Sequence, residues 1–216
     1  MALDSLLRDV VDKLGFIRAA VRLLVARGVS PNLLSLFSLL CAALAGVAFA
    51  LSSGGSGRGA INLPLVLAAV FVALNAFLDG LDGLVAREMG NASRKGDFLD
   101  HVIDRYADLL MIGGIVFGSY APWPIGLLAL LGVLLASYMG TQAQAVGIGR
   151  MYGGILGRAD RIVLILGATI LTVIYPLPLP SSGPVSFSFL GWALVIFAVL
   201  GHATALQRFV NTWRQL

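Results

Sequence analysis

A series of long apolar runs constrains this chain more than any other feature of its sequence. Five runs lie near residues 33–52, 61–78, 125–148, 162–179 and 185–206. Each approaches the ~20 residues that an α-helix needs to cross ~30 Å of hydrocarbon. Charged residues make up only 12% of the 216 residues, against about a quarter in soluble domains. This composition excludes a disordered chain, a soluble DNA-binding domain and a secreted disulfide scaffold.

A sixth run, residues 109–121, is too short to span a membrane by itself. It spans only if its helix begins upstream near Gly96, and it then carries Asp100, Asp104 and Asp108 into or near the membrane. We therefore predict an all-α integral membrane protein with six transmembrane helices in residues 30–216. Residues 1–29 combine apolar side chains at helical spacing with frequent charges, which predicts an amphipathic helix lying in the membrane interface. Together, residues 1–216 are expected to form one membrane domain.

The distribution of basic residues predicts the orientation. Three Gly-, Pro- and Ser-rich connectors, residues 52–59, 120–124 and 176–184, contain only Arg58 of the 15 Lys and Arg. The other 14 lie on the opposite side or at its helix ends, so the positive-inside rule makes that side cytoplasmic. Both termini are expected in the cytoplasm and the protein in the cell membrane. The net charge of +4 then indicates contact with anionic membrane lipids, and no nucleic acid partner is expected.

Acidic residues gather in one short part of the sequence. Seven of the eleven fall between positions 79 and 108: Asp79, Asp82, Glu88, Asp97, Asp100, Asp104 and Asp108. Asp79, Asp82, Gly83 and Arg87 have the spacing of one helix face, and Asp97, Asp100, Asp104 and Asp108 have the spacing of another. Two such helices, joined by a turn near residues 90–95, would pack antiparallel and bring the two acidic faces together.

Facing carboxylates repel one another, and burying them without partners costs several kcal/mol each. Divalent cations remove this problem, because Mg²⁺ and similar ions prefer oxygen ligands. His101 and His202 are isolated, so the sequence offers no Cys/His zinc site. A solvated charged loop and a cation or proton transporter are the alternatives. A transporter usually distributes its acids over several broken helices, whereas these acids lie at one end of two neighbouring helices.

The acidic segment resembles the signature of the CDP-alcohol phosphotransferase family. The string runs Asp79-Gly80-Leu81-Asp82-Gly83-Leu84-Val85-Ala86-Arg87, eight residues, Gly96, three residues, Asp100, three residues, Asp104. Every fixed position of that signature is present. The opening Ser30-Pro31-Asn32 also resembles the start of the first span in this family. The resemblance implies a six-helix membrane enzyme, usually a homodimer, that transfers a phosphoalcohol group from a CDP-alcohol to a second alcohol near the cytoplasmic surface and releases CMP.

The resemblance also implies residue roles. Two divalent ions, Mg²⁺ or Mn²⁺, would be bound by Asp79, Asp82, Asp100 and Asp104. Asp104 would also be the general base that deprotonates the acceptor hydroxyl. The nucleotide site would be formed by Gly80, Gly83, Ala86, Arg87 and Gly96. The residues independently fit this chemistry, since glycines let phosphates approach the backbone and arginine binds phosphate with two donors.

A second polar cluster bears on the acceptor. The candidates are Gln142, Arg158, Arg161 and Arg208, and several arginines near the metal site would suit a phosphorylated polyol. Ordinary flanking charge of membrane helices is the alternative. Arg158 and Arg161 resemble acceptor-phosphate residues of phosphatidylinositol phosphate synthases, so inositol 1-phosphate is the first choice. Gly140 and Gln142 stand where those synthases commonly have Lys and Arg, which keeps glycerol 3-phosphate as the second choice.

The donor is expected to be a CDP-linked lipid, because a cleft between membrane helices could open sideways to the bilayer. Residues 157–161 resemble archaeal members of the family, whose donor is a CDP-linked ether lipid, so both phosphatidyl and archaetidyl donors are considered. A soluble donor such as CDP-inositol stays open. The spacing Gly114-x-x-x-Gly118 predicts close approach of two helices, either within the chain or between two copies.

Overall fold

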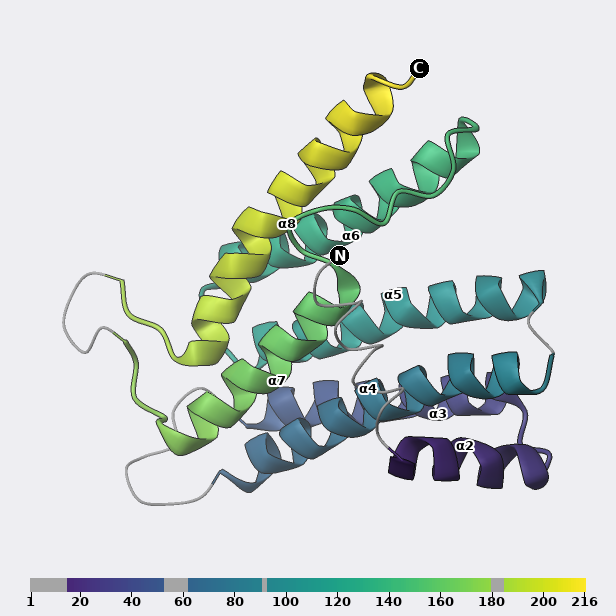
Figure 1. Cartoon of the computed structure of the whole chain (residues 1–216). Helices are drawn as coiled ribbons and strands as arrows, with labels where there is room; N and C mark the ends of the chain where they lie inside the picture. Colours follow the sequence, from purple (N-terminus) through teal and green to yellow (C-terminus); the bar gives the residue numbers. More distant parts are fainter. Residues whose placement is uncertain (1–14, 53–61, 91–92, 180–184) are drawn as a thin grey trace.

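The computed structural model describes residues 15–52, 62–90, 93–179 and 185–216. Within these ranges the regular secondary structure is helical apart from one isolated antiparallel bridge between Leu179 and Phe187, and turns and irregular segments connect the helices. Figure 1 shows the helices: α2 (Gly15–Ala26), α3 (Pro31–Leu51), α4 (Leu63–Glu88), α5 (Arg94–Phe117), α6 (Trp123–Ala145), α7 (Arg158–Ile174) and α8 (Phe189–Trp213).

Polar caps fix where the long helices begin. The Ser30 and Ser93 hydroxyls accept hydrogen bonds from the amides of Leu33 (3.3 Å) and Gly96 (3.1 Å), and they begin α3 and α5. Asn62 caps α4 in the same way. The acidic segment 79–88 is not a separate element: α4 runs without a break through the apolar run to Glu88. The acids of α4 are therefore placed by a membrane-length helix.

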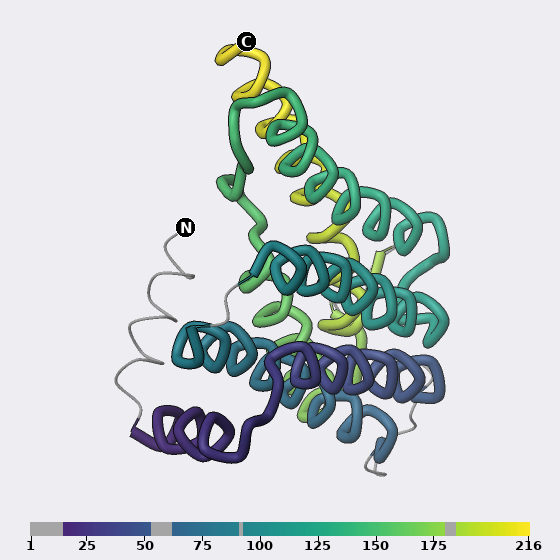
Figure 2. The backbone as a smooth tube through the Cα atoms, turned by 90° about the vertical axis from the view of Figure 1, so that its right-hand side faces the viewer, coloured from purple at the N-terminus to yellow at the C-terminus, as the bar shows by residue number. Residues whose placement is uncertain are grey.

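The helices form two packed groups. α3 lies along both α4 and α5, while α6 and α8 pack against each other; α7 contacts α4 and α8 and so joins the groups (Figure 2). The centre is filled by fully buried apolar side chains, including Phe49, Val72, Met111, Ile115 and Phe197. This arrangement places the acid-bearing ends of α4 and α5 beside each other.

Glycine pairs permit the closest helix contacts. A Cβ on Gly114 would overlap the backbone of Gly46, which brings α5 onto α3. Similarly, a Cβ on Gly201 would overlap the backbone of Gly132, which brings α8 onto α6. Gly118 also meets the Phe49 carbonyl. The Gly114-x-x-x-Gly118 spacing thus serves contact between α3 and α5 within the chain.

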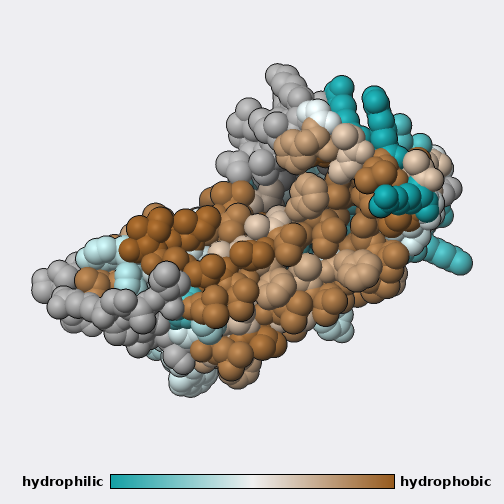
Figure 3. Space-filling model, turned by 90° about the horizontal axis from the view of Figure 1, so that it is seen from below, coloured by the Kyte–Doolittle hydropathy of each residue, from teal (hydrophilic) through white to brown (hydrophobic). Residues whose placement is uncertain are grey.

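Among the described residues, four helices are long and apolar enough to cross a membrane by length and composition: α3, α4, α6 and α8. Seen from below, apolar side chains cover most of the visible face and hydrophilic ones gather at one end (Figure 3). α5 carries the acidic cluster in its first half, and α7 has only 17 residues. The chain is therefore a helical membrane protein, and by this measure its described part contains four candidate spans against the six predicted.

Helix α2 is amphipathic, as its sequence pattern predicts. Ile17 and Val21 are buried against a cluster containing Leu81 and Val85 of α4. Arg18 lies exposed on the other side. The preceding half of the predicted interfacial helix, residues 1–14, falls outside the described residues.

Candidate active site

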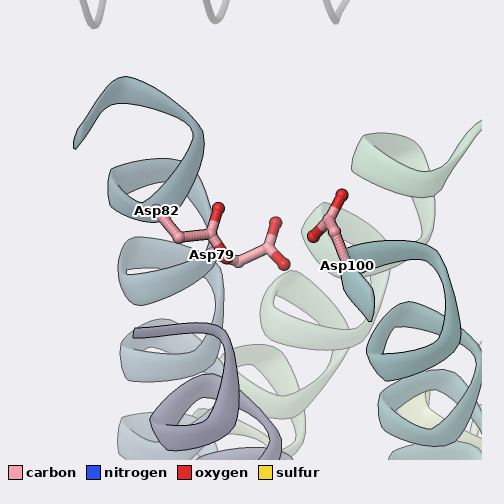
Figure 4. Close-up of side chains that lie close together, drawn as sticks. All are labelled: Asp79, Asp82 and Asp100. Atoms are coloured by element: carbon pink, nitrogen blue, oxygen red, sulfur yellow. The ribbon is translucent and has the colours of Figure 1, made fainter. Parts of the chain in front are cut away.

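Three carboxylates from two helices converge. Asp79 and Asp82 lie one turn apart on α4, and Asp100 lies in the second turn of α5. Figure 4 shows them pointing toward one another across the gap between the helices. One oxygen from each lies within 4.8 Å of the others. These oxygen donors fit a divalent cation such as Mg²⁺ or Mn²⁺, because like charges this close need a counter-ion.

A hydroxyl from a third helix holds one of these carboxylates. Ser35 of α3 donates a hydrogen bond to Asp82 Oδ2 at 2.5 Å, and both side chains are buried. Ser38 donates to the Ser35 carbonyl, and the Asn75 side chain donates to the Ser38 carbonyl. α3 therefore contributes to the site although it carries no acidic residue.

Asp104 is tied to the cluster through an arginine. Arg158, the first residue of α7, donates from both terminal nitrogens to the two Asp79 oxygens, each at 2.6 Å. The same guanidinium lies 2.6 Å from Asp104 Oδ1. Arg158 thus bridges two of the four predicted metal ligands, and Asp104 itself is only 6% exposed.

The alternation of charge continues into the protein. Arg105 lies 3.6 Å from both Asp104 and Asp108, and Arg161 donates to Asp108 at 2.7 Å. Oppositely charged groups from α4, α5 and α7 therefore follow one another from Asp79 to Arg161. Such pairing offsets the cost of burying each charge.

The predicted nucleotide residues lie on α4 and at the start of α5, the two helices that carry the converging acids. A Cβ on Gly80 would meet no atom within 4 Å, so the backbone there can be approached closely. The Arg87 guanidinium lies over Gly83, 3.6 Å from where its Cβ would be. Gly96 lies at the start of α5 beside Asn32, and Ala86 is half-buried on α4.

The predicted acceptor residues separate into two groups. Arg158 and Arg161 join the acids, as described above. Arg208 instead donates to the backbone carbonyls of Ala136 (2.6 Å), Gly153 (2.7 Å) and Tyr152 (3.2 Å), so it anchors the segment before α7.

Gln142 is exposed and lies near the end of α6. It lines a largely apolar cavity of about 140 Å³ together with Phe209 and Trp213. The described contacts do not join it to Arg158, Arg161 or the acids.

Two residues of the site, Ser35 and Arg105, are not indicated by the sequence. Ser35 lies in an apolar helix, and no local signal links it to Asp82, which is 47 positions away. Arg105 follows Asp104 directly in the sequence. The sequence alone does not show that its guanidinium lies near the carboxylates of both Asp104 and Asp108. Asp108 was identified as part of the acidic face, and the structure adds its partners.

Comparison with known proteins agrees with the signature. A family model described as CDP-alcohol phosphatidyltransferase matches residues 28–204. An archaetidylinositol phosphate synthase of Methanothermobacter thermautotrophicus is 34% identical over 83% of this chain and 80% of its own length. One from Pyrococcus horikoshii is 34% identical over 70% of this chain and 74% of its own. A phosphatidylinositol phosphate synthase of Streptomyces avermitilis is 29% identical over 89% of this chain and 75% of its own length.

Solved structures share the fold. A phosphatidylinositol phosphate synthase of Mycobacterium tuberculosis, in complex with manganese and citrate, superposes with a TM-score of 0.74. It is 22% identical, and the match covers 91% of this chain and 88% of that one. The same enzyme with CDP-DAG bound gives a TM-score of 0.73, and the match covers 91% of this chain and 93% of that one.

Proposed function

Because the chain belongs to the CDP-alcohol phosphatidyltransferase family, we propose that it transfers a phosphatidyl or archaetidyl group from a CDP-linked lipid to a hydroxyl of inositol 1-phosphate and releases CMP. The names of its relatives, archaetidylinositol and phosphatidylinositol phosphate synthase, support this acceptor. The observation that carries the proposal is the meeting of carboxylates from α4 and α5 with two arginines of α7.

Each part of the site has a role in this reaction. Asp79, Asp82, Asp100 and Asp104 would hold two divalent cations, Mg²⁺ or Mn²⁺. The bound ions would neutralise the pyrophosphate and stabilise the leaving CMP. Gly80, Gly83, Ala86, Arg87 and Gly96 would line the nucleotide site. Backbone without side chains at the glycines admits the diphosphate, and the exposed Arg87 can bind it bidentately.

The transfer step needs one base and in-line alignment. The acceptor hydroxyl oxygen forms a bond to the lipid-bearing phosphorus, and the bond from this phosphorus to the bridging oxygen breaks. CMP leaves with that electron pair. Asp104 takes the hydroxyl proton, which its burial beside the other carboxylates supports.

The acceptor phosphate is assigned to the arginines of α7. Arg158 and Arg161 lie one turn apart on α7; Arg158 contacts Asp79 and Asp104, and Arg161 contacts Asp108. Arg208 would contribute by holding the segment before α7 in place, since its donors bind backbone carbonyls. Gln142 is the least supported acceptor residue because it lines the separate apolar cavity. Glycerol 3-phosphate would use the same arginines and is the second acceptor to test.

The membrane arrangement follows from helix length. α5 has 24 residues, about 36 Å of helix, and α7 has 17, about 25 Å. We infer that both cross the bilayer with α3, α4, α6 and α8, which gives six spans in one domain. The positive-inside rule supports a cytoplasmic site and cytoplasmic termini. A homodimer in the cell membrane completes the proposal and is testable by light scattering in detergent.

CMP release by the purified protein in detergent tests the function. CDP-diacylglycerol, its archaetidyl ether analogue or CDP-inositol would be supplied as donor with Mn²⁺ and one acceptor at a time: inositol 1-phosphate, glycerol 3-phosphate, free inositol or serine. We expect release with inositol 1-phosphate and none with free inositol. Release with glycerol 3-phosphate alone would move the acceptor assignment, and release only with CDP-inositol would replace the lipid donor. No release with any pair would favour the cation or proton transporter.

A further inference from the structure

Asp108 is an acidic residue that the family signature does not include, and it lies deeper than the four signature acids. It is 2% exposed, and its partner Arg161 is 3% exposed. Arg161 donates to Asp108 Oδ2 at 2.7 Å, and the Arg105 guanidinium lies 3.6 Å from the same oxygen. One carboxylate therefore binds two guanidiniums, one from α7 and one from its own helix.

These three groups leave two hydrogen-bond donors unused. Two guanidiniums face the Asp108 carboxylate, and Arg105 also pairs with Asp104 at 3.6 Å. The Nε atoms of Arg105 and Arg161 are both buried and have no hydrogen-bond partner among the described residues. A buried donor without a partner is costly, so this pair of arginines is suited to an additional anion.

Two ion pairs between α5 and α7 follow one another along these helices. Arg158 pairs with Asp104. Arg161, three residues further along α7, pairs with Asp108, four residues further along α5. The first pair lies at the expected reacting centre. The second pair holds Arg161 at Asp108, which lies about one helical turn further along α5 than Asp104.

Resting on the function proposed above, we propose that Asp108 is a positioning residue that holds Arg161 and Arg105 in place to bind the acceptor's phosphate. Asp108 acts through these arginines and touches neither substrate. If Asp108 loses its negative charge, Arg161 loses its counter-ion. Arg105 is then left with Asp104 as its neighbouring carboxylate. Loss of the Asp108 charge should therefore weaken binding of the acceptor and leave binding of the CDP-lipid unchanged.

Steady-state kinetics of charge and length variants test this role. Asp108→Asn removes the charge at nearly constant volume, and Asp108→Glu keeps it. Asp97→Asn is the matched control, because Asp97 lies exposed on the same helix outside this chain of charges. We expect Asp108→Asn to raise the KM for inositol 1-phosphate about tenfold or more, with the KM for CDP-lipid changed less than about twofold. Asp108→Glu should recover most of the loss. Equal effects on both KM values would overturn the proposal.

A double-mutant cycle with Arg161→Gln separates positioning from general destabilisation. If Asp108 acts through Arg161, Asp108→Asn should add little to the acceptor KM in the Arg161→Gln background, and the neutral pair should fold even if the single variant does not. An unchanged effect in that background would overturn the proposal.

Stabilisation against heat by inositol 1-phosphate gives a binding readout that does not need turnover. If the wild type releases no CMP yet is stabilised by this ligand and Asp108→Asn is not, the proposed reaction fails and the positioning role stands. Equal stabilisation of both would exclude the role.

Discussion

The Ser35 hydroxyl on α3 holds the Asp82 carboxylate on α4 through a buried hydrogen bond of 2.5 Å. This contact fixes one oxygen of a side chain that, with Asp79 and Asp100, forms the convergent acid group. An orienting partner of this kind commonly changes metal affinity by 10–100-fold when it is removed. The apolar helix that carries Ser35 thus contributes to the proposed metal site.

Ser35→Ala should weaken Mn²⁺ binding about tenfold, because Asp82 loses the donor that orients it. Titration of Mn²⁺ followed by electron paramagnetic resonance measures the affinity directly. Ser38→Ala is the control: it removes a buried hydroxyl from the same helix that donates to the Ser35 carbonyl and does not touch Asp82. Equal losses in the two variants would show that Ser35 acts only through helix stability.

Arg158→Ala should have opposite effects on two ligands. The guanidinium occupies oxygens of Asp79 and Asp104 that a divalent cation would use, so its removal should tighten Mn²⁺ binding without substrates by several-fold to about tenfold. The KM for inositol 1-phosphate should rise by at least the same factor. Arg214→Ala, at the exposed end of α8, is the control. Weaker Mn²⁺ binding in Arg158→Ala would contradict this competition.

Asp104→Asn should lower kcat by about 10²–10⁴-fold, the contribution typical of a general base. The amide keeps an oxygen near the same position but cannot take the proton. Binding of CDP, measured by calorimetry, should remain detectable. Glu88→Gln, exposed at the end of α4, provides a matched charge removal. A near-normal kcat in Asp104→Asn would assign the base to another residue.

Removal of divalent cations by EDTA should abolish CMP release, and added Mn²⁺ or Mg²⁺ should restore it. The carboxylates of α4 and α5 would otherwise leave the pyrophosphate facing like charges. Turnover in EDTA at the untreated rate would exclude a metal-dependent mechanism. Adding Ca²⁺ in place of Mn²⁺ in the same assay would test how strictly the site selects among oxygen-preferring ions.

Neighbouring glycines on α5 should respond in opposite directions to the same substitution. Gly114→Ala places a Cβ against the backbone of Gly46 and should lower the melting temperature in detergent, with a cost of about 1–3 kcal/mol. Gly113→Ala meets no atom within 4 Å and should be neutral or stabilising by up to about 1 kcal/mol, because alanine favours the helix. An unchanged melting temperature in Gly114→Ala would show that α3 and α5 can separate without cost.

The sequence by itself determined the features that depend on local spacing. Apolar runs predicted the long helices α3, α4, α6 and α8, and the spacing of Asp79, Asp82, Asp100 and Asp104 predicted two acidic faces on consecutive helices. The signature then identified the family. These features are readable because helical periodicity and membrane length are properties of a single segment.

Only the tertiary structure decided which side chains meet across helices. Ser35 reaches Asp82, Arg158 bridges Asp79 and Asp104, and Arg161 binds Asp108. The predicted acceptor residues diverge, since Arg208 binds backbone carbonyls and Gln142 lines an apolar cavity. Such pairings depend on the register and tilt with which helices pack, and close contacts such as Gly46 with Gly114 set that register. No single segment contains this information.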